Sequence, residues 1–373
     1  MSTAFSSSDL TPPHHDAPMP LVASDETMGG AFGARFERAF RTATSEEGVL
    51  GAALDHHFGS RGKRHRAQLA LDAAAALGLS EGVATSFAVA CELLHNASLV
   101  HDDLQDRDQH RRGRPTVWSL FGDDVAINVG DFLLCRAFET AAEAPISPQH
   151  ALDVVGAFSR ATTAVIRGQI ADNDYARAPR IDLAYFESIA RSKTGPLLAL
   201  PVQAAVAARG LAPLHRGVVA GAFEALAVAF QTSNDVADLL DRDARAAGSD
   251  LRAGRPNVVV GLHTRLIDDR FLARVDAARA LLLTHPDQLD QLVSEVASSP
   301  AVEEAFRLVD RAIERARETA SRLPEALQPI FESTARRISD PIDALRVRRE
   351  HAENAHEVLV EACSASTPIP VQL

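Results

Sequence analysis

Apolar residues recur at three- and four-residue spacing from about residue 36 to residue 230, and clusters of Gly, Pro or Asp/Ser interrupt them. This spacing is typical of one face of an α-helix, so the segment is expected to form a stack of helices. Two windows, 67–79 and 84–105, are apolar on nearly every side, which predicts helices buried among other helices. Between residues 262 and 358, charged residues at i,i+3 and i,i+4 flank an apolar stripe, which indicates amphipathic helices on the outside.

A strand-like run occurs at residues 258–260, and one short run among helices is expected to be a helix start or a loop. Aromatic residues make up only 5% of the chain, while Ala, Leu, Arg and Glu recur, so composition also favours helix. The prediction is an all-α fold, a single-domain helical bundle over residues 35–362 with a central cavity. Residues 1–34 are expected to form a flexible extension and residues 363–373 a frayed tail.

Net charge and cysteine usage restrict the class of protein. The 373 residues include 38 Lys+Arg and 50 Asp+Glu, a net charge of −12, which argues against binding nucleic acid or an anionic membrane surface. The three cysteines lack metal-type spacing, so neither a zinc site nor a disulfide framework is expected. No Lys or Arg precedes Arg35, and the apolar stretches are too short to cross a bilayer. The chain is therefore expected to be cytoplasmic, without stable membrane insertion.

Three carboxylates gather at the end of the apolar window 84–105. Asp102 and Asp106 are one helical turn apart and project from one face, with Asp103 beside them. Like charges held this closely are unfavourable unless a cation neutralises them, and such oxygen ligands suit Mg²⁺ shared with phosphate oxygens. The segment could equally be a solvated acidic helix end. The basic turn at 111–116, which comes directly after it, favours a site for a diphosphate.

A second acidic pattern closes another apolar helix about 130 residues later. Asn234 and Asp238 are one helical turn apart, and Asp235 lies between them. Either acidic pattern alone could be a helix cap or a turn. Together, the two could face each other across a helical bundle and hold metal ions between them.

Lysine usage gives an independent indication of a phosphate-binding site. Of the 38 basic residues only Lys63 and Lys193 are lysines, and both have neighbours typical of segments that contact phosphate. An ammonium group binds phosphate oxygens as a point charge, without the planar fork of arginine. Chance placement of two lysines is the alternative explanation.

These blocks together resemble the trans-isoprenyl diphosphate synthases, also called the polyprenyl synthetase family, over roughly residues 36–262. Residues 101–106 with 111–116 are similar to the family's first aspartate-rich motif and its trailing arginines. Residues 234–238, followed by 248–251, resemble the second motif. The resemblance implies an isoprenoid synthase fold, a homodimer, and transfer of an allylic prenyl diphosphate onto isopentenyl diphosphate to give a longer trans-prenyl diphosphate. It also implies Mg²⁺ as the cofactor, with three ions when substrate is bound.

The resemblance assigns roles to particular residues. The metal ligands would be the oxygen-bearing side chains of the two motifs, Asp102, Asp103, Asp106, Asn234, Asp235 and Asp238. Substrate would be bound by basic or imidazole side chains, namely Lys63, Arg66, His95, Arg111, Arg112, Arg245 and Arg255. The groups flanking the reacting carbons and leaving group would be Lys193, Thr194 and Gln231. Taken alone, His95 would more often be a buried core histidine than a ligand.

The chain departs from the family's pattern at several positions. The second motif begins with Asn234 where the family usually has Asp, which keeps an oxygen donor but removes one charge, so the ion there should bind more weakly. Arg245 and Arg255 stand where lysines are common, and Arg61 precedes Gly62 where the family has a double glycine. These differences bear on activity more than on fold.

The helix that leads into the first motif bears on product length. Ala97 and Ser98, in the turn before Asp102, are small and resemble the residues of synthases that make geranylgeranyl or longer chains. A bulkier floor could lie deeper, at Leu94, Cys91 or Phe87. Small residues could also simply permit close helix packing.

Two other functions stay open at this point. A class I terpene cyclase also has a second metal motif beginning Asn-Asp, but it normally has Ser or Thr where this chain has Asp238 and Glu where it has Arg242. A cyclase also has no use for an isopentenyl diphosphate site. A non-catalytic regulatory subunit of a synthase is suggested by Asn234, but the three carboxylates of the first motif argue against it.

Overall fold

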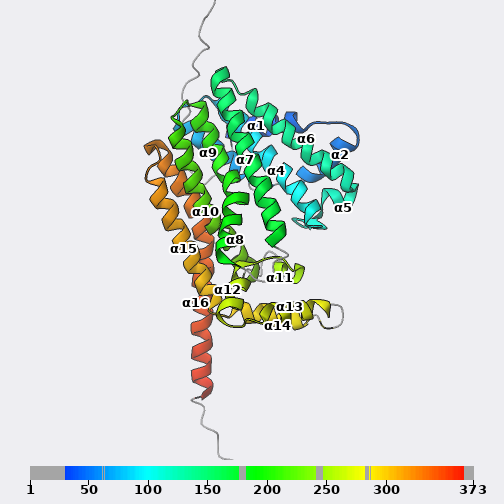
Figure 1. Ribbon diagram of the computed structural model, residues 1–373, viewed down its shortest axis with the longest axis vertical. Coiled ribbons are helices and arrows are strands. Elements are labelled where there is room, and N and C mark those ends of the chain that lie inside the picture. The colour runs from blue at the N-terminus through cyan, green and yellow to red at the C-terminus, as the bar shows by residue number, and fades with distance from the viewer. Residues whose placement is uncertain are drawn as a thin grey trace, which may run out of the picture. The chain divides into compact units, whose positions relative to one another are not determined.

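The computed structural model describes residues 30–60, 62, 64–175, 182–240, 247–281, 285 and 287–364, and these are almost entirely helical (Figure 1). The predicted all-α fold is confirmed. Backbone contacts group the chain into two compact units, where the sequence predicts a single bundle. Unit 1 comprises Met1–Phe158 and Pro201–Leu211, and unit 2 comprises Ser159–Leu200 and Ala212–Leu373. Two of the three boundaries fall inside continuous helices, α7 (Pro148–Tyr175) and α9 (Gly195–Ala208), and the third lies between α9 and the next helix.

Unit 1 is built around α4 (Glu81–Gln105), which packs against its neighbours α3 and α6. Its remaining helices are α1 (Gly30–Thr44), α2 (Gly48–Phe58), α3 (His65–Ala76), α5 (Val117–Phe121) and α6 (Asp123–Ala142). Helix α4 begins at the side-chain cap of Ser80, whose hydroxyl accepts a hydrogen bond from the Val83 N–H at 3.4 Å. Phe87 and Leu93 are fully buried, so the predicted central helix is confirmed.

The expectation that the apolar stretches are too short to cross a bilayer is wrong for α4, which is long and apolar enough by length and composition. However, 78% of that apolar window is buried inside the protein. Burial on nearly every side is what the helix at the centre of a helical core shows.

A two-stranded hairpin comes after α4 and was not expected from the sequence. Strands β1 (His110–Arg111) and β2 (Arg114–Pro115) pair antiparallel. The two residues between them, Arg112 and Gly113, have φ of 53° and 75°, the left-handed conformation that two-residue hairpin turns require. The turn reverses the chain, so the basic side chains after the acidic motif lie close to it.

Unit 2 is organised on α10 (Pro213–Leu240), which packs against α12, α15 and α16. The Phe223 ring of α10 meets Phe331 of α16 edge-on at 5.8 Å. The remaining elements are α8 (Leu183–Ile189), the π-helix η1 (Ala190–Thr194), α11 (Ser249–Ala253), α12 (Val258–Leu266), α13 (Phe271–Ala280), α14 (Asp287–Ala297), α15 (Ala301–Ala320), η2 (Glu325–Leu327) and α16 (Gln328–Ser364).

The strand-like run at 258–260 is the start of α12, as predicted. Its helical conformation has a local cause. The Asn257 side-chain oxygen accepts hydrogen bonds from the N–H groups of Val259 at 3.0 Å and Val260 at 3.4 Å. This cap satisfies two donors that have no partner inside the helix, and it outweighs the β propensity of three valines.

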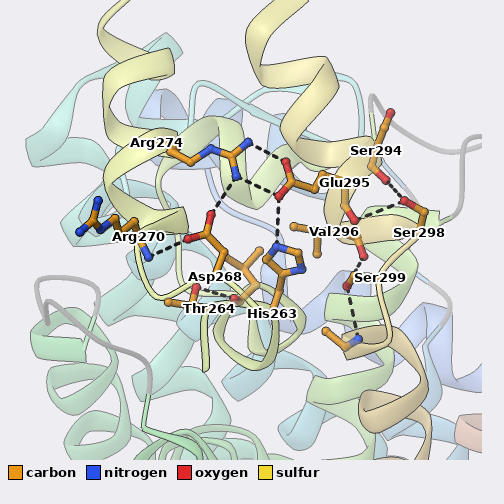
Figure 2. A network of polar contacts seen from close by, with 12 residues as sticks. His263, Thr264, Asp268, Arg270, Arg274, Ser294, Glu295, Val296, Ser298 and Ser299 are labelled. Atoms are coloured by element: carbon orange, nitrogen blue, oxygen red, sulfur yellow. Dashed lines mark hydrogen bonds and ion pairs between the residues drawn. The ribbon is translucent and has the colours of Figure 1, made fainter. Parts of the chain in front are cut away.

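A polar network joins α12, α13 and α14 (Figure 2). The Arg274 guanidinium donates to Glu295 at 2.7 and 2.9 Å and to Asp268 at 2.8 Å. The His263 ring, only 1% exposed, lies 3.4 Å from the Glu295 carboxylate, and burial lowers the pKa of this imidazole. The network fastens three short helices to one another, although its outer ion pairs are too exposed to contribute much stability.

The ends of the described chain differ slightly from the expected boundaries. Helix α1 begins at Gly30, within the segment expected to be a flexible extension, and α16 continues to Ser364. Residues 1–29 and 365–373, which make up most of the extension and of the tail, lie outside the described residues.

Gly168 of α7 gives a test of the packing in unit 2. A Cβ atom at this position would lie 2.5 Å from the backbone nitrogen of Lys193 in η1. We expect Gly168→Ala to lower the free energy of unfolding by roughly 1–3 kcal/mol, because the overlap is with backbone. Gly217→Ala is the matched control, since nothing lies within 4 Å of its added Cβ, and it should be neutral or stabilising by up to about 1 kcal/mol. Urea unfolding of both variants measures this, and equal midpoints would contradict the packing.

Candidate functional site

The first acidic motif lies at the C-terminal end of α4 in unit 1. Asp102 and Asp103 are in its last turn, and Asp106 is the residue that caps it. Asp102 is half-buried and Asp106 is exposed, whereas Asp103 is only 2% exposed. The predicted helix end with carboxylates one turn apart is therefore present, and the middle carboxylate turns inward.

Asp103 is held by Arg111 of the hairpin. The Arg111 Nε donates to the two carboxylate oxygens at 2.7 and 2.9 Å, and a terminal guanidinium nitrogen lies 2.7 Å from Oδ1. Burial works against the charge on Arg111, but its hydrogen bonds to Asp103 raise the pKa of the guanidinium above its usual value. The charge of Asp103 is thus balanced by the Arg111 guanidinium. Its role as a metal ligand stays a prediction.

The carboxylates of this helix end suit one mode of Mg²⁺ binding, in which the protein shares the ion with a substrate. Among the described residues, no group of three or more His, Cys, Asp or Glu side chains could hold a metal ion. Mg²⁺ is usually bound through one or two carboxylates together with substrate phosphates rather than in an all-protein cage. Asp102 and Asp106, on one face of α4, are suited to that mode of binding.

Basic and imidazole side chains gather beside this motif. Arg66 of α3, His95 of α4, and Arg111 and Arg112 of the hairpin lie close enough to influence one another's charge. Burial, and then the neighbouring arginines, hold the pKa of His95 well below its ordinary value, so the ring is neutral. The Arg66 Nε and the His95 Nδ1 are buried and have no hydrogen-bond partner. We call these four residues the basic group.

The two unpaired atoms of the basic group are unusual, because unsatisfied buried polar atoms are rare in folded proteins.

Arg112 connects the basic group to the segment before α3. It donates to the Ser60 carbonyl at 3.4 Å, and its guanidinium lies against Gly62, where an added Cβ would approach within 2.9 Å. The basic group therefore adjoins the segment that carries Lys63. Lys63 itself lies outside the described residues.

A small cavity of about 20 Å³ lies between α2, α4 and the hairpin, large enough for roughly one water. Among the residues that line it are His57, Asn96 and Arg111. The His57 Nε2 is 3.0 Å from the Asn96 side-chain oxygen, and burial lowers the pKa of His57 to about 4. His57 is therefore a neutral donor at physiological pH.

The second motif lies at the C-terminal end of α10 in unit 2. Asn234 is exposed and Asp238 is half-buried, one turn apart as predicted, whereas Asp235 is only 2% exposed. The expectation that the two motifs hold metal ions between them stays a prediction, since they belong to different units.

Asp235 is engaged by the protein on both oxygens. One oxygen accepts the Val258 N–H at 2.7 Å, and the other accepts the Gln231 side-chain amide at 3.0 Å. The Asn257 amide donates to the Asp235 backbone carbonyl at 3.0 Å. Burial, followed by the nearby Asp250 carboxylate, raises the pKa of Asp235 well above its usual value. In this geometry Asp235 ties the end of α10 to the start of α12.

Asp238 holds the loop that returns to the motif. It accepts hydrogen bonds from the Ser249 N–H at 3.1 Å, from the Ser249 hydroxyl, and from the Asp250 N–H at 3.2 Å. Asp250 thereby joins Asp235 and Asp238. It lies in the segment 248–251 that the resemblance placed with the second motif, although no role was assigned to it.

Lys193 lies on the π-helix η1, and its ammonium donates to Asp172 of α7 at 2.7 Å. Thr194, next to it, is half-buried. Asp172 was not expected at the site, because its contact with Lys193 joins residues 21 positions apart in the chain. Gln169 is 7% exposed, and its side-chain oxygen is buried without a partner.

Of the two remaining predicted substrate ligands, Arg255 is among the described residues. Arg255 is half-buried, and its N–H donates to the Asp250 carbonyl at 2.8 Å, so it lies near the second motif. Arg245 lies outside the described residues.

The chain is similar in sequence to several known proteins. The polyprenyl synthetase family model matches residues 47–278. The (2E,6E)-farnesyl diphosphate synthase of Mycobacterium tuberculosis is 36% identical over 202 residues, 53% of this chain and 56% of that enzyme, so the chain matches about half of the relative's length. The geranylfarnesyl diphosphate synthase of Aeropyrum pernix is 30% identical over 285 residues, 74% of this chain and 88% of that enzyme.

The fold is also found among solved structures. The polyprenyl synthase of Caulobacter crescentus CB15, complexed with calcium and isoprenyl diphosphate, superimposes with a TM-score of 0.71 at 23% identity. The match covers 82% of this chain and 93% of that one.

His57 predicts a pH dependence of stability. The folded protein keeps the ring neutral down to about pH 4, whereas the unfolded chain takes up a proton near 6.5. Stability is therefore lost as pH falls from 6.5 to 4, by an amount on the order of 3 kcal/mol. We expect His57→Gln, which keeps a donor for Asn96, to lose less stability over this range in urea titrations. Parallel curves for the variant and the unmodified protein would contradict this assignment.

Proposed function

Because this chain belongs to the polyprenyl synthetase family, we propose that it is a Mg²⁺-dependent trans-prenyltransferase. It joins an allylic prenyl diphosphate to isopentenyl diphosphate and releases a longer trans-prenyl diphosphate and free diphosphate. Relatives named for farnesyl and geranylfarnesyl diphosphate synthesis support this reaction class.

The observation that carries the proposal is in unit 1. The basic group, with its buried Arg66 Nε and His95 Nδ1 lacking partners, lies beside a helix end that bears Asp102 and Asp106. The Arg66 Nε–H is a donor, and a neutral His95 can donate through one ring nitrogen. Such groups next to the carboxylates of Asp102 and Asp106 match a ligand with many acceptor oxygens that also shares a divalent cation. A diphosphate has both properties.

The residues of unit 1 divide the work of binding. Arg66, His95 and Arg112 would hold the diphosphate of isopentenyl diphosphate, with Lys63 of the same basic segment. Arg111, already fixed by Asp103, would contact the allylic diphosphate with the part of its guanidinium that Asp103 leaves available. A guanidinium with a fixed fork holds a phosphate in one orientation, so the two substrates are aligned before reaction.

Asp102 and Asp106 would hold Mg²⁺, which neutralises charge on the departing diphosphate. Asn234 and Asp238 of unit 2 would supply oxygen ligands for a further ion, and the family's pattern implies three ions with substrate bound. A neighbour complexed with calcium and isoprenyl diphosphate supports a divalent cation in this role.

The covalent step is governed by charge. The allylic C–O bond breaks with its electron pair moving to the diphosphate, and the double bond of isopentenyl diphosphate attacks the allylic carbon. Loss of one proton restores a double bond in a product longer by one isoprene unit. The Lys193 ammonium, fixed by Asp172, and the Thr194 hydroxyl would lie near the reacting carbons and stabilise the charge that develops on the leaving group.

The product is proposed to be geranylgeranyl diphosphate or longer. Ala97, 3% exposed on α4, is small, as the longer products would need. Bulkier side chains that could end a growing tail are buried nearer the N-terminal end of the same helix, at Leu94, Cys91 and Phe87. A homodimer and a cytoplasmic location are part of the proposal and stay predictions.

The first test supplies dimethylallyl, geranyl and farnesyl diphosphates separately with isopentenyl diphosphate and Mg²⁺, followed by mass analysis of the products. We expect products longer by isoprene units, and we expect EDTA to abolish their formation. Asp102→Asn should lower kcat by about 10²-fold or more, because a metal-held charge is lost. Asp269→Asn, which changes an exposed aspartate in the loop before α13, is the control and should leave kcat unchanged.

The other two functions give different results in the same assay. A terpene cyclase would convert geranylgeranyl diphosphate alone into a hydrocarbon or an alcohol. A non-catalytic subunit would form no product with any starter. Either outcome would refute the proposed prenyltransferase.

Asn234 predicts a weak metal site that one substitution should strengthen. Asn234→Asp adds a carboxylate at an exposed position one turn from Asp238, so the Mg²⁺ concentration for half-maximal rate should fall several-fold. Without Mg²⁺ the added like charge should lower the melting temperature slightly, and Mg²⁺ with diphosphate should restore it. An unchanged Mg²⁺ dependence would show that residue 234 does not face the ion.

A further inference from the structure

Arg64, at the start of α3, has a backbone conformation that arginine rarely adopts. Its φ and ψ are 50° and 31°, in the left-handed region, and it occupies the N-cap position of the helix. Glycine and asparagine are the usual residues in this region, because a larger side chain is strained there. Such strain persists only where the surroundings hold the residue in place, and it is concentrated at functional sites.

The side chain of Arg64 is held from two sides. Its guanidinium donates to Glu92 of α4 at 3.3 Å and lies over the Phe40 ring of α1, 4.3 Å from the ring centroid. The Glu92 side chain is only 5% exposed. An ion pair buried this deeply is costly to break, because the remaining charge would be left without a partner, and the aromatic face adds a cation–π contact.

Glu92 also holds the first turn of α3 directly. Its second oxygen accepts the Ala67 N–H at 3.1 Å, one of the helix N-terminal donors that have no partner within the helix. A carboxylate at a helix N-terminus is also favoured by the helix dipole. One buried side chain thus fixes the start of α3 through both its backbone and Arg64. Arg66, whose Nε is buried without a partner, lies in the same turn.

We propose that Glu92 and Arg64 are positioning residues, which set the place of Arg66 in the first turn of α3 so that isopentenyl diphosphate is bound. This inference rests on the proposed function. Neither residue needs to contact the substrate. Both Glu92 oxygens are taken by Arg64 and Ala67, and a carboxylate facing a diphosphate directly would repel it.

Two variants separate charge from backbone strain. Glu92→Gln keeps the shape and an acceptor for Ala67 but removes the charge that holds Arg64. Arg64→Gly removes the ion pair and places glycine where φ is positive, so it relieves the strain instead of adding to it. Glu295→Gln is the matched control, since it breaks another Arg–Glu pair, that with Arg274 in unit 2 (Figure 2).

Binding of isopentenyl diphosphate to the full chain is measured by calorimetry without Mg²⁺, alongside steady-state kinetics with it. We expect Glu92→Gln and Arg64→Gly to raise both Kd and KM for isopentenyl diphosphate at least tenfold. The KM of the allylic substrate and kcat at saturation should change less than twofold. Glu295→Gln should leave all four values unchanged, whatever its melting temperature. Arg64→Lys, which keeps a cation, should restore part of the lost affinity.

The outcomes distinguish the inference from the function on which it rests. If the unmodified chain does not bind isopentenyl diphosphate, the proposed function fails. If the unmodified chain binds it and Arg64→Gly binds it equally tightly, the positioning role is overturned, even if Glu92→Gln does not fold. Equal losses for both substrates that track the melting temperature would also overturn it, because they would indicate a general loss of structure.

Discussion

A carboxylate that a fold removes from water must receive a donor, and much of this protein's site is arranged around that requirement. Asp103 receives the guanidinium of Arg111, and Asp235 receives the backbone N–H of Val258. Glu92 receives both a guanidinium and a helix N-terminus. An unpaired charge in these positions would cost several kcal/mol. The hairpin, the start of α12 and the start of α3 are therefore fixed by the same physical need.

The features that sequence reasoning found are those with local causes. Helical periodicity alone was enough to predict that Asp102 and Asp106 lie on one face at the end of α4 and that Asn234 and Asp238 lie one turn apart on α10. The helix starting at Val258 was identified because one β-branched run cannot form a sheet without partners, and Asn257 supplies its cap. Side chains a few residues apart determine such features, so the sequence contains the information directly.

The features it missed have causes other than helical periodicity. Asp172 meets Lys193 across 21 positions, and the hairpin is a local turn that depends on a left-handed Arg112. The inward turn of Asp103 and Asp235 was missed for the same reason, because each carboxylate was interpreted from its own helix without the partner that other elements provide. Burial and partner choice are properties of tertiary packing, and a single sequence does not state them.

The π-helix η1 has a consequence for how the Lys193 position tolerates change in length. A five-residue repeat within a helical run carries one residue more than the α-helical repeat. The wide turn takes up this extra residue locally, so the α-helices on either side, α8 and α9, keep their regular winding. Deleting one residue from η1 would turn the wide turn into an ordinary α-helical one and would change the direction of the Lys193 side chain toward Asp172. The π-helical turn of η1 therefore determines the direction in which the Lys193 side chain points.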